Sequence, residues 1–328
     1  MKKYLGFIII LLIFSVCAKN KNPLSPSDIS NFAIFLLKNP NITYQQVEEQ
    51  NLDQLEIQTE PWLSSDDISM YDFSTHFIYL KNDKEPLFKD MVDDSYVFIN
   101  FLLKPFVLVA NHERIYSGCF ISSLSSFACN GPNICDIEQL FYPTDIIPIH
   151  GCDIEGWDDA RNDPRIKSAL SELNLYHAGL TVTLNNVNII ENSDTSTIRY
   201  SFTIYNNDQD DLLIPDPDLM GSEFFHYYTN AIDFWSSNNK YYYSQFKEVT
   251  APDPSDSWDP SWFSELKSNK SVQRTVQLKG YPKLPLGTYK SYFIYSGPSK
   301  INRAERINQD DRYWLGDVKS NTISININ

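Results

Sequence analysis

Alternating apolar and polar residues run through the second half of the chain. Five runs are bounded by clusters of Asn, Asp, Pro or Gly, at residues 180–190, 197–208, 271–278, 287–297 and 321–328, and several of them alternate, as at residues 181–184 and 289–295. Side chains alternate between the two faces of a strand, so a period of two is typical of a strand with one buried face. The pattern predicts an all-β unit over residues 179–328, built as a β-sandwich with long insertions.

The first half of the chain mixes strand and helix patterns. β-branched and aromatic residues crowd three runs, at 71–80, 95–103 and 104–121. The third run contains Asn111-His112, a predicted reversal between two strands. Residues 162–179 predict a helix, because Pro164 suits a first turn and apolar residues follow it at helical spacing. We therefore expect an α+β unit over residues 56–178.

Residues 18–55 predict a tether followed by short helices. Ser27 or Asp28 would cap the first helix, and Pro40 would stop it. A second, polar helix is expected over residues 43–55.

The first residues have the pattern of an export signal, which we assign to residues 1–17. Two lysines precede an apolar run that ends at Val16 and is shorter than the roughly 20 residues of a membrane span. Cys17 follows at once, which predicts lipidation of Cys17, although Val16 is larger than the residue usual before a lipidated cysteine. The alternative is simple secretion after cleavage at Ala18. Either way we expect an exported protein of the cell envelope, touching a membrane only through a lipid anchor.

Four further cysteines lie close together in the first half, at Cys119, Cys129, Cys135 and Cys152. Clustered cysteines in an exported chain are typical of disulfides, and four of them allow three pairings. Their spacing contains no C-x2-C pair, so a zinc site is not expected.

The stretch PIHGCD at 148–153 offers a second interpretation of Cys152. His150-Gly-Cys152 resembles the S/T-H-G-C motif of L,D-transpeptidases, and the resemblance implies a cysteine nucleophile with His150 as its base. Ile149 stands where that family has Ser or Thr. Asp153 follows the cysteine directly and would oppose thiolate formation. We expect a disulfide at Cys152 and a protein that is not an enzyme.

Charge and motifs limit the partners further. The chain carries a formal net charge of −15, which repels nucleic acid and anionic headgroups. No Gly-rich phosphate loop occurs, so we expect no cofactor. The acidic residues 206–211 could bind calcium, but the EF-hand spacing from Asp208 is missing. We expect a solvated hairpin loop there and no metal.

Aromatic residues supply the candidate binding surface. Residues 224–246 are rich in Phe, Tyr and Trp, and most of these are expected in the core. Trp258 and Trp262 instead lie in a Pro/Ser/Asp-rich segment that predicts a loop. Aromatic side chains dominate contacts with proteins and sugars. Trp258 and Trp262 are therefore the candidate ligand contacts.

One short stretch carries a resemblance to a known fold. KLPLGTYKSYFIY, at 283–295, is similar to the segment that leads into a late strand of immunoglobulin-like domains, and it places Tyr289 at the corner between sheets. The first half resembles uncharacterised exported bacterial proteins. Together these features predict an α+β N-terminal domain followed by an all-β immunoglobulin-like sandwich.

The expected function is that of a non-catalytic envelope or surface protein, binding or structural, which recognises a protein or glycan partner. The alternative is an envelope enzyme, either one that uses Cys152 and His150 or a glycan-acting hydrolase. The five histidines give no second catalytic motif, because they are scattered along the chain without an HExxH pattern.

Overall fold

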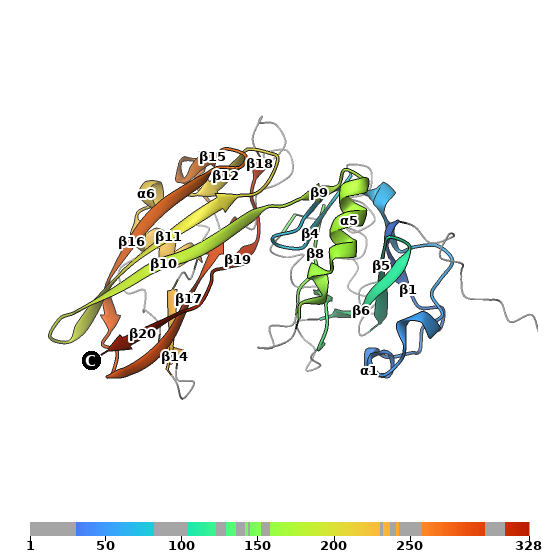
Figure 1. Ribbon diagram of the computed structural model, residues 1–328, viewed down its shortest axis with the longest axis horizontal. Coiled ribbons are helices and arrows are strands. Elements are labelled where there is room, and N and C mark those ends of the chain that lie inside the picture. The colour runs from blue at the N-terminus through green and yellow to red at the C-terminus, as the bar shows by residue number, and fades with distance from the viewer. Residues whose placement is uncertain are drawn as a thin grey trace, which may run out of the picture.

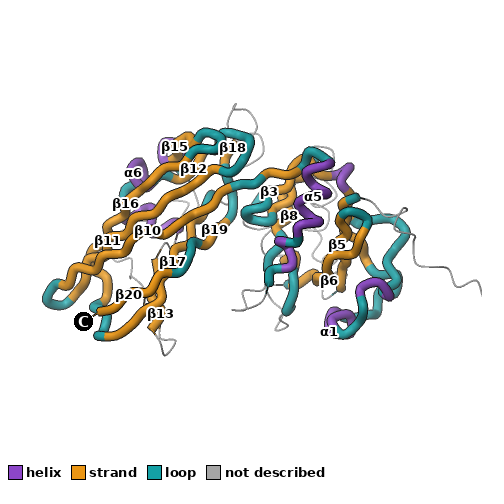
Figure 2. Tube along the Cα trace, in the orientation of Figure 1, coloured by secondary structure: helices purple, strands orange, loops and turns teal. Residues whose placement is uncertain are grey.

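The computed structural model describes residues 31–81, 104–122, 129–135, 142–143, 145–151, 158–229, 232–236, 241–242, 258–298 and 312–327. Within these residues the fold is rich in β-strands, and its helices are short. Figure 1 shows two groups of elements side by side, and Figure 2 shows strands in both, with the longer ones in the C-terminal half. The α-helices are α1 (Tyr44–Glu48), α5 (Pro164–Glu172), α6 (Pro217–Met220) and α7 (Ser222–Thr229). Single 3-10 turns occupy Leu52–Gln54, Ser65–Asp67, Ala160–Asn162 and Pro260–Trp262.

The N-terminal half is built from two sheets. Its strands are β1 (Phe32–Leu36), β2 (Leu63–Ser64), β3 (Ile68–Asp72), β4 (Phe77–Leu80), β5 (Pro105–Ala110), β6 (Glu113–Ile121), β7 (Asn133–Cys135), β8 (Ile146–Pro148) and β9 (Tyr176–His177). One sheet has the order β2-β1-β5-β6-β7 and the other the order β8-β4-β3-β9. Side chains from both sheets and from α5 share one apolar core.

The helix expected before Pro40 is wrong for Phe32–Leu36, which is strand β1. Phe32 and Ile34 pack into the core between the two sheets, whereas Ala33 and Phe35 pack into a second core that contains residues near α1. Both faces of β1 are therefore buried. A strand buried on both faces is a continuous apolar run, and its periodicity does not distinguish it from a buried helix.

Other elements of this half follow the sequence pattern. β5 and β6 form a hairpin, and Asn111 and His112 turn the chain with φ of 50° and 61°, the left-handed backbone of a tight hairpin turn. The predicted helix is α5, with Pro164 in its first turn and Asp163 as its N-cap. The polar helix expected over 43–55 is shorter, with α1 and one 3-10 turn. The strand expected over 95–103 lies outside the described residues.

The C-terminal half is built from longer strands. They are β10 (Leu180–Glu191), β11 (Thr195–Asn206), β12 (Leu212–Pro215), β13 (Ile232–Ser236), β14 (Tyr241–Tyr242), β15 (Phe263–Leu266), β16 (Ser271–Pro282), β17 (Gly287–Ser296), β18 (Arg312–Tyr313), β19 (Asp317–Lys319) and β20 (Ile323–Ile327). The sheet orders are β10-β11-β16, β15-β12-β18 and β14-β13-β17-β19, with β20 also paired to β17. All five strands predicted for this half are present.

One aromatic-rich core fills the C-terminal half. Alternate residues of β11, including Tyr200 and Phe202, point into this core, and Phe293 and Tyr295 reach it from β17. The ring centroids of Phe202 and Phe293 lie 4.5 Å apart. The period-two pattern of β11 thus places one apolar face against the opposite sheet, as the sequence predicted.

A third apolar cluster lies where the two halves meet. Phe77 and Tyr79 of β4 contribute to this cluster, while Ile78 between them faces the N-terminal core. Tyr313 and Leu315 contribute from the C-terminal half, next to β18. Side chains of β4 pack into both of these cores. The two halves are therefore joined by buried apolar surface as well as by the linking chain.

Candidate functional site

The cysteines fall in the N-terminal half. Cys119 of β6 is joined to Cys129 by a disulfide, which confirms the predicted disulfide for these two cysteines. Cys135 is buried at the end of β7. Cys17 and Cys152 lie outside the described residues.

His150 pairs through its backbone with Asn133, next to β7. Burial, and then the nearby positive charge of Arg161, lower the pKa of His150 to about 4. At neutral pH this imidazole is uncharged, so it would bring no positive charge to a neighbouring thiolate.

The two candidate contact residues, Trp258 and Trp262, are half-buried. Their ring centroids are 6.4 Å apart, and the ring of Tyr228 lies 4.7 Å from Trp258 and 5.3 Å from Trp262. Phe224 stacks beside Trp262 at 5.8 Å. Both indoles therefore belong to an aromatic cluster and are not isolated loop side chains.

Tyr289 lies at the start of β17 and is 2 % exposed. Its hydroxyl donates a hydrogen bond to the carbonyl oxygen of Pro285 at 2.7 Å. A buried phenol needs such a partner. This is the geometry of a tyrosine that fixes the chain where it enters a strand.

A cluster of buried charges joins the two halves where the chain passes from β9 to β10. Asp72 ends β3 and His177 ends β9, and the two residues are partners in neighbouring parallel strands. Asp208 comes from the turn after β11, and Arg312 begins β18. Strand ends from both halves thus bring two carboxylates, an imidazole and a guanidinium together.

Arg312 bridges the two carboxylates of this cluster. Its Nη1 lies 3.1 Å from Asp72 Oδ2, and its Nη2 lies 2.7 Å from Asp208 Oδ2. His177 Nδ1 is 3.0 Å from the other oxygen of Asp208. Both carboxylate side chains are fully buried. A buried carboxylate is very costly without a partner, so the cluster depends on contributions from both halves.

A second polar contact crosses the junction next to this cluster. Ser74 Oγ donates to Asp72 at 2.6 Å and accepts from the indole Nε1 of Trp314 at 3.2 Å. Gly179, at the joint between the halves, has a φ of +66° and donates its N–H to Asp208 at 3.2 Å. A Cβ at Gly179 would collide with Ser74 and Asp72, so a side chain there would push the halves apart.

The charges in the cluster stabilise one another. Burial alone would raise the pKa of Asp208, but the hydrogen bond from His177 and the charge of Arg312 outweigh it and lower that pKa to about 2. Burial alone would lower the pKa of Arg312, but Asp72 and Asp208 raise it above its ordinary value. Because ionised Asp208 can only accept hydrogen bonds, His177 must donate through Nδ1.

The same residues include a possible set of metal ligands. One donor atom each from His177, Asp208 and Asp210 lies within 4.8 Å of the others. The guanidinium of Arg312 faces the carboxylates of Asp208 and Asp210. Its Nη2 lies 2.7 Å from Asp208, and its Nε lies 3.8 Å from Asp210. The chain therefore supplies a cation of its own at this position.

A groove of about 880 Å³ runs beside the junction cluster and has walls from both halves. The turn between β3 and β4, with residues 73–76, forms one wall together with Arg161, Lys167 and Tyr176. Leu180, Thr181, Asn207 and residues 317–319 form the other. Polar and apolar groups line the groove in about equal measure, and amide, hydroxyl, carboxylate and ammonium groups are among the polar ones.

His76 lies in the wall of this groove and is 5 % exposed. Its Nδ1 is 3.2 Å from the hydroxyl of Tyr71, and its Nε2 is 4.0 Å from Asp159. Burial and the charge of Arg161 lower the pKa of His76 to about 3, against the opposing effect of Asp159. The φ of His76 is 59°, a conformation that costs energy for a non-glycine residue and is common near functional sites.

No local sequence pattern predicted the charge cluster at this junction. The interpretation of 206–211 as a solvated loop is wrong for Asp208, which is fully buried. Arg312 lies more than 100 residues from Asp208 in the chain, and no local pattern connects them. The available signal was weak: an arginine followed directly by Tyr313, Trp314 and Leu315, an apolar run that predicts burial.

No helix among the described residues is long and apolar enough to cross a membrane. No protein-family model matches the chain, and no curated protein matches its sequence. The geometry of the junction and of the pockets is therefore the basis for the functional inference.

Proposed function

We propose that the chain is an exported, non-catalytic binding protein of the cell envelope, which recognises a protein or glycan partner in the groove between its two halves. It would consist of an α+β unit followed by an immunoglobulin-like β-sandwich, and it would be tethered by lipid on Cys17 or secreted. The buried position of Tyr289 and its bond to Pro285 support the immunoglobulin-like assignment.

The observation that carries the proposal is the shared groove beside the Arg312 cluster. A groove assembled from two movable units would have to be ordered during binding, and that ordering reduces affinity. Here the buried pairs of Arg312 with Asp72 and Asp208 hold the walls in place before a partner arrives. A preformed groove lined by both polar and apolar groups suits a binding protein.

The chemistry of the groove favours binding over catalysis. A general acid or base works best when its pKa lies near the working pH. The pKa of His76 is about 3, and Tyr71, its hydrogen-bond partner, is fully buried. Asp159 is held by Arg161 through a bond of 2.6 Å, which lowers the pKa of Asp159 despite the opposing effect of burial.

Site-specific photo-crosslinking tests the groove. A benzophenone amino acid would replace Lys167 on one wall or Lys319 on the other, in the full chain expressed in cells. Both positions are exposed. Lys283, which is also exposed and pairs with Glu191 outside the groove, provides the matched control.

We expect cross-links from both groove positions to the same partner and none from Lys283. Loss of the product after protease treatment of the partner identifies a protein, and loss after periodate oxidation identifies a glycan. Equal yields from Lys283, or no product from either wall, would contradict binding in the groove.

The proposed anchor has a separate test. Mass spectrometry of the mature N-terminus should find diacylglycerol on Cys17, because this cysteine directly follows the apolar run. A mature chain that begins at Lys19 would show simple secretion and leave the binding proposal intact.

A further inference from the structure

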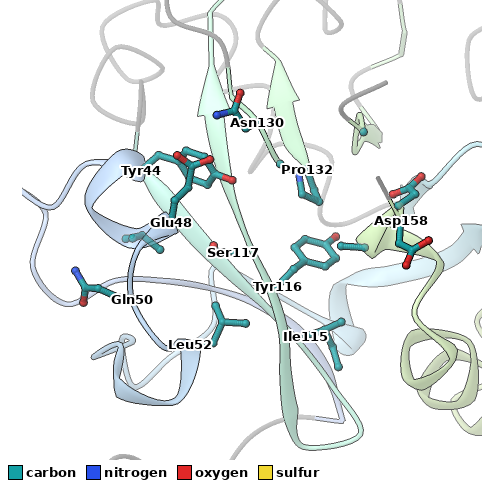
Figure 3. A pocket seen from close by; sticks show the side chains of 15 residues that line it. Tyr44, Glu48, Gln50, Leu52, Ile115, Tyr116, Ser117, Asn130, Pro132 and Asp158 are labelled. Atoms are coloured by element: carbon teal, nitrogen blue, oxygen red, sulfur yellow. The ribbon is translucent and has the colours of Figure 1, made fainter. Parts of the chain in front are cut away.

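A second pocket, of about 580 Å³, lies wholly in the N-terminal half (Figure 3). Its walls come from α1 and the turn after it, from residues 115–117 of β6, and from the segments 130–132 and 158–160. The volume is in the range of pockets that hold small organic molecules. The pocket shares Asp159 with the groove, but the rest of its lining is distinct.

Two glycines in the lining of this pocket are in close contact with neighbouring side chains. A Cβ at Gly131 would collide with the hydroxyl of Tyr44, and a Cβ at Gly151 would collide with the guanidinium of Arg161. Larger residues at either position would require the neighbouring side chain to move. The close approach of Tyr44 and Arg161 to the pocket wall therefore depends on these two glycines.

Tyr116 carries a polar group that the free protein does not use. The residue is 5 % exposed, and its hydroxyl has no hydrogen-bond partner among the described residues. Burial raises the pKa of Tyr116 well above its ordinary value, so the hydroxyl keeps its proton. An unpaired buried hydroxyl costs about 1–3 kcal/mol, and in a native protein it calls for an explanation. In Figure 3 the ring of Tyr116 projects between Pro132 and Asp158.

The charged groups among the described residues that line the pocket are all acidic. Glu48 and Asp158 are exposed and lie on opposite sides of Tyr116 (Figure 3). Neither forms an ion pair within the described part of the chain, and no lysine or arginine is among the described lining residues. Arg161 is held by Asp159. Arg114 donates to the backbone carbonyl of Leu52 behind the lining. The described lining residues themselves therefore present only negative charge.

The exposure of the aromatic residues indicates whether the pocket suits a cation or a neutral sugar. Sugar binding uses the open face of an aromatic ring, but Tyr44 and Tyr116 are only 3 % and 5 % exposed. Two carboxylates without partners instead attract positive charge, and a tyrosine hydroxyl oxygen accepts a hydrogen bond from an ammonium group. The lining fits an organic cation better than a sugar.

We propose that the pocket formed by α1, β6 and Asp158 binds an organic cation that carries primary ammonium groups. Glu48 and Asp158 would pair with the positive charge, and the Tyr116 hydroxyl would accept a hydrogen bond from it. This site shares only Asp159 with the groove at the junction, and the proposal gives Asp159 no role. The ammonium group could belong to a free diamine or to the lysine side chain of a basic peptide, and both present the same chemistry.

Isothermal titration calorimetry at constant ionic strength tests this proposal on the full chain. The probes are 1,5-diaminopentane, the neutral analogue 1,5-pentanediol, the anionic analogue glutarate, and a trilysine peptide. We expect saturable binding of the diamine, the peptide or both, and none of the diol or glutarate. Binding of the diamine alone identifies a free amine as the ligand type, and binding of the peptide alone identifies a lysine side chain.

Three variants locate the site. Glu48→Gln, Asp158→Asn and Tyr116→Phe should each weaken binding by about tenfold or more, which is the effect of losing about 1.4 kcal/mol. Asp194→Asn removes an equally exposed carboxylate on the distant β10–β11 hairpin and should leave the affinity unchanged. The melting temperature of Tyr116→Phe without ligand should equal or exceed that of the original chain, because no bond is lost.

Three results would overturn the proposal. The first is that neither ammonium probe binds, and the second is that the diol binds as tightly as the diamine. The third is that Asp194→Asn weakens binding as much as Asp158→Asn, which would show bulk attraction by an acidic protein. A lower melting temperature of free Tyr116→Phe would show that its hydroxyl already has a partner. The crosslinking test of the groove is unaffected by any of these outcomes.

Discussion

The two halves of the molecule bury their apolar residues in different ways. The N-terminal half has short strands, and both faces of β1 and β5 are covered, so its apolar residues are divided between separate cores. The C-terminal half has strands of up to 12 residues and one aromatic-rich core. Every cysteine of the chain lies before residue 153, and residues 179–328 contain none.

This difference indicates where each half obtains its stability. The N-terminal half divides its buried residues between two cores and adds a covalent cross-link, which stabilises by restricting the unfolded chain. The Cys119–Cys129 bond ties β6 to the segment before β7, close to the pocket at Tyr116. The C-terminal half relies on ring packing instead.

Removal of a central ring should damage the C-terminal half most. Phe293 is fully buried and contacts Tyr200, Phe202 and Phe225. Phe293→Ala should lower the free energy of unfolding by about 3–5 kcal/mol, because it leaves a cavity as well as losing apolar burial. Urea denaturation followed by tryptophan fluorescence measures the loss, and exposed Ile190→Ala serves as the control. A loss below about 1 kcal/mol would show that this core is not the main support.

Removal of the disulfide should affect the N-terminal half. Replacing Cys119 and Cys129 together with serine opens a loop with a sequence separation of 10 residues, and should cost about 2–4 kcal/mol. Hydrogen exchange of the amides in β5 and β6 measures this cost locally. Thiol titration of the denatured, unreduced protein should find Cys119 and Cys129 blocked, and two reactive thiols at these positions would refute the disulfide.

Acid should weaken the junction. Folding lowers the pKa of Asp208 from 3.8 to about 2. Ionised Asp208 therefore contributes about 2 kcal/mol above pH 5, and this contribution disappears as the pH falls from about 5 to about 2. Asp208→Asn should be less stable than the original chain at pH 7 and nearly equal to it at pH 2. An equal deficit at both pH values would exclude a role for the charge.

The smallest expected loss of stability is at Tyr289, where the chain enters β17. Tyr289→Phe removes one hydrogen bond to the Pro285 carbonyl and should cost about 1 kcal/mol. Thermal unfolding monitored by circular dichroism is sufficient to detect it. Tyr205→Phe, at an exposed tyrosine of β11, is the matched control, and equal effects of the two changes would remove the special role of Tyr289.

Residue order alone predicted much of the β-rich fold because local spacing determines it. The inward residues of β11 alternate over the whole strand, and Asn111 and His112 mark a hairpin by their position between two apolar runs. Phe32–Leu36 was misread because burial on both faces removes that alternation. The correct predictions were for strands with one face in the core and the other exposed to water.

The candidate sites were harder to predict because they depend on contacts between distant parts of the chain. Arg312 meets Asp72 across 240 residues and Asp208 across 104, and these pairs compensate the charges of the two buried carboxylates. Tyr116 has the sequence neighbours of an ordinary strand residue, and only the folded chain leaves its hydroxyl without a partner among the described residues. Such features require the tertiary arrangement.

The central claim is that the junction makes the two halves one cooperative unit. Four of the six tryptophans lie after residue 179, so fluorescence mainly reports the C-terminal half, whereas reductant acts only on cysteines of the N-terminal half. Thermal unfolding followed by tryptophan fluorescence, with and without reductant, therefore tests the coupling directly. We expect reductant to lower the fluorescence-detected melting temperature by about 4–8 °C. A fluorescence transition that reductant leaves unchanged would show that the halves unfold independently and would contradict the claim.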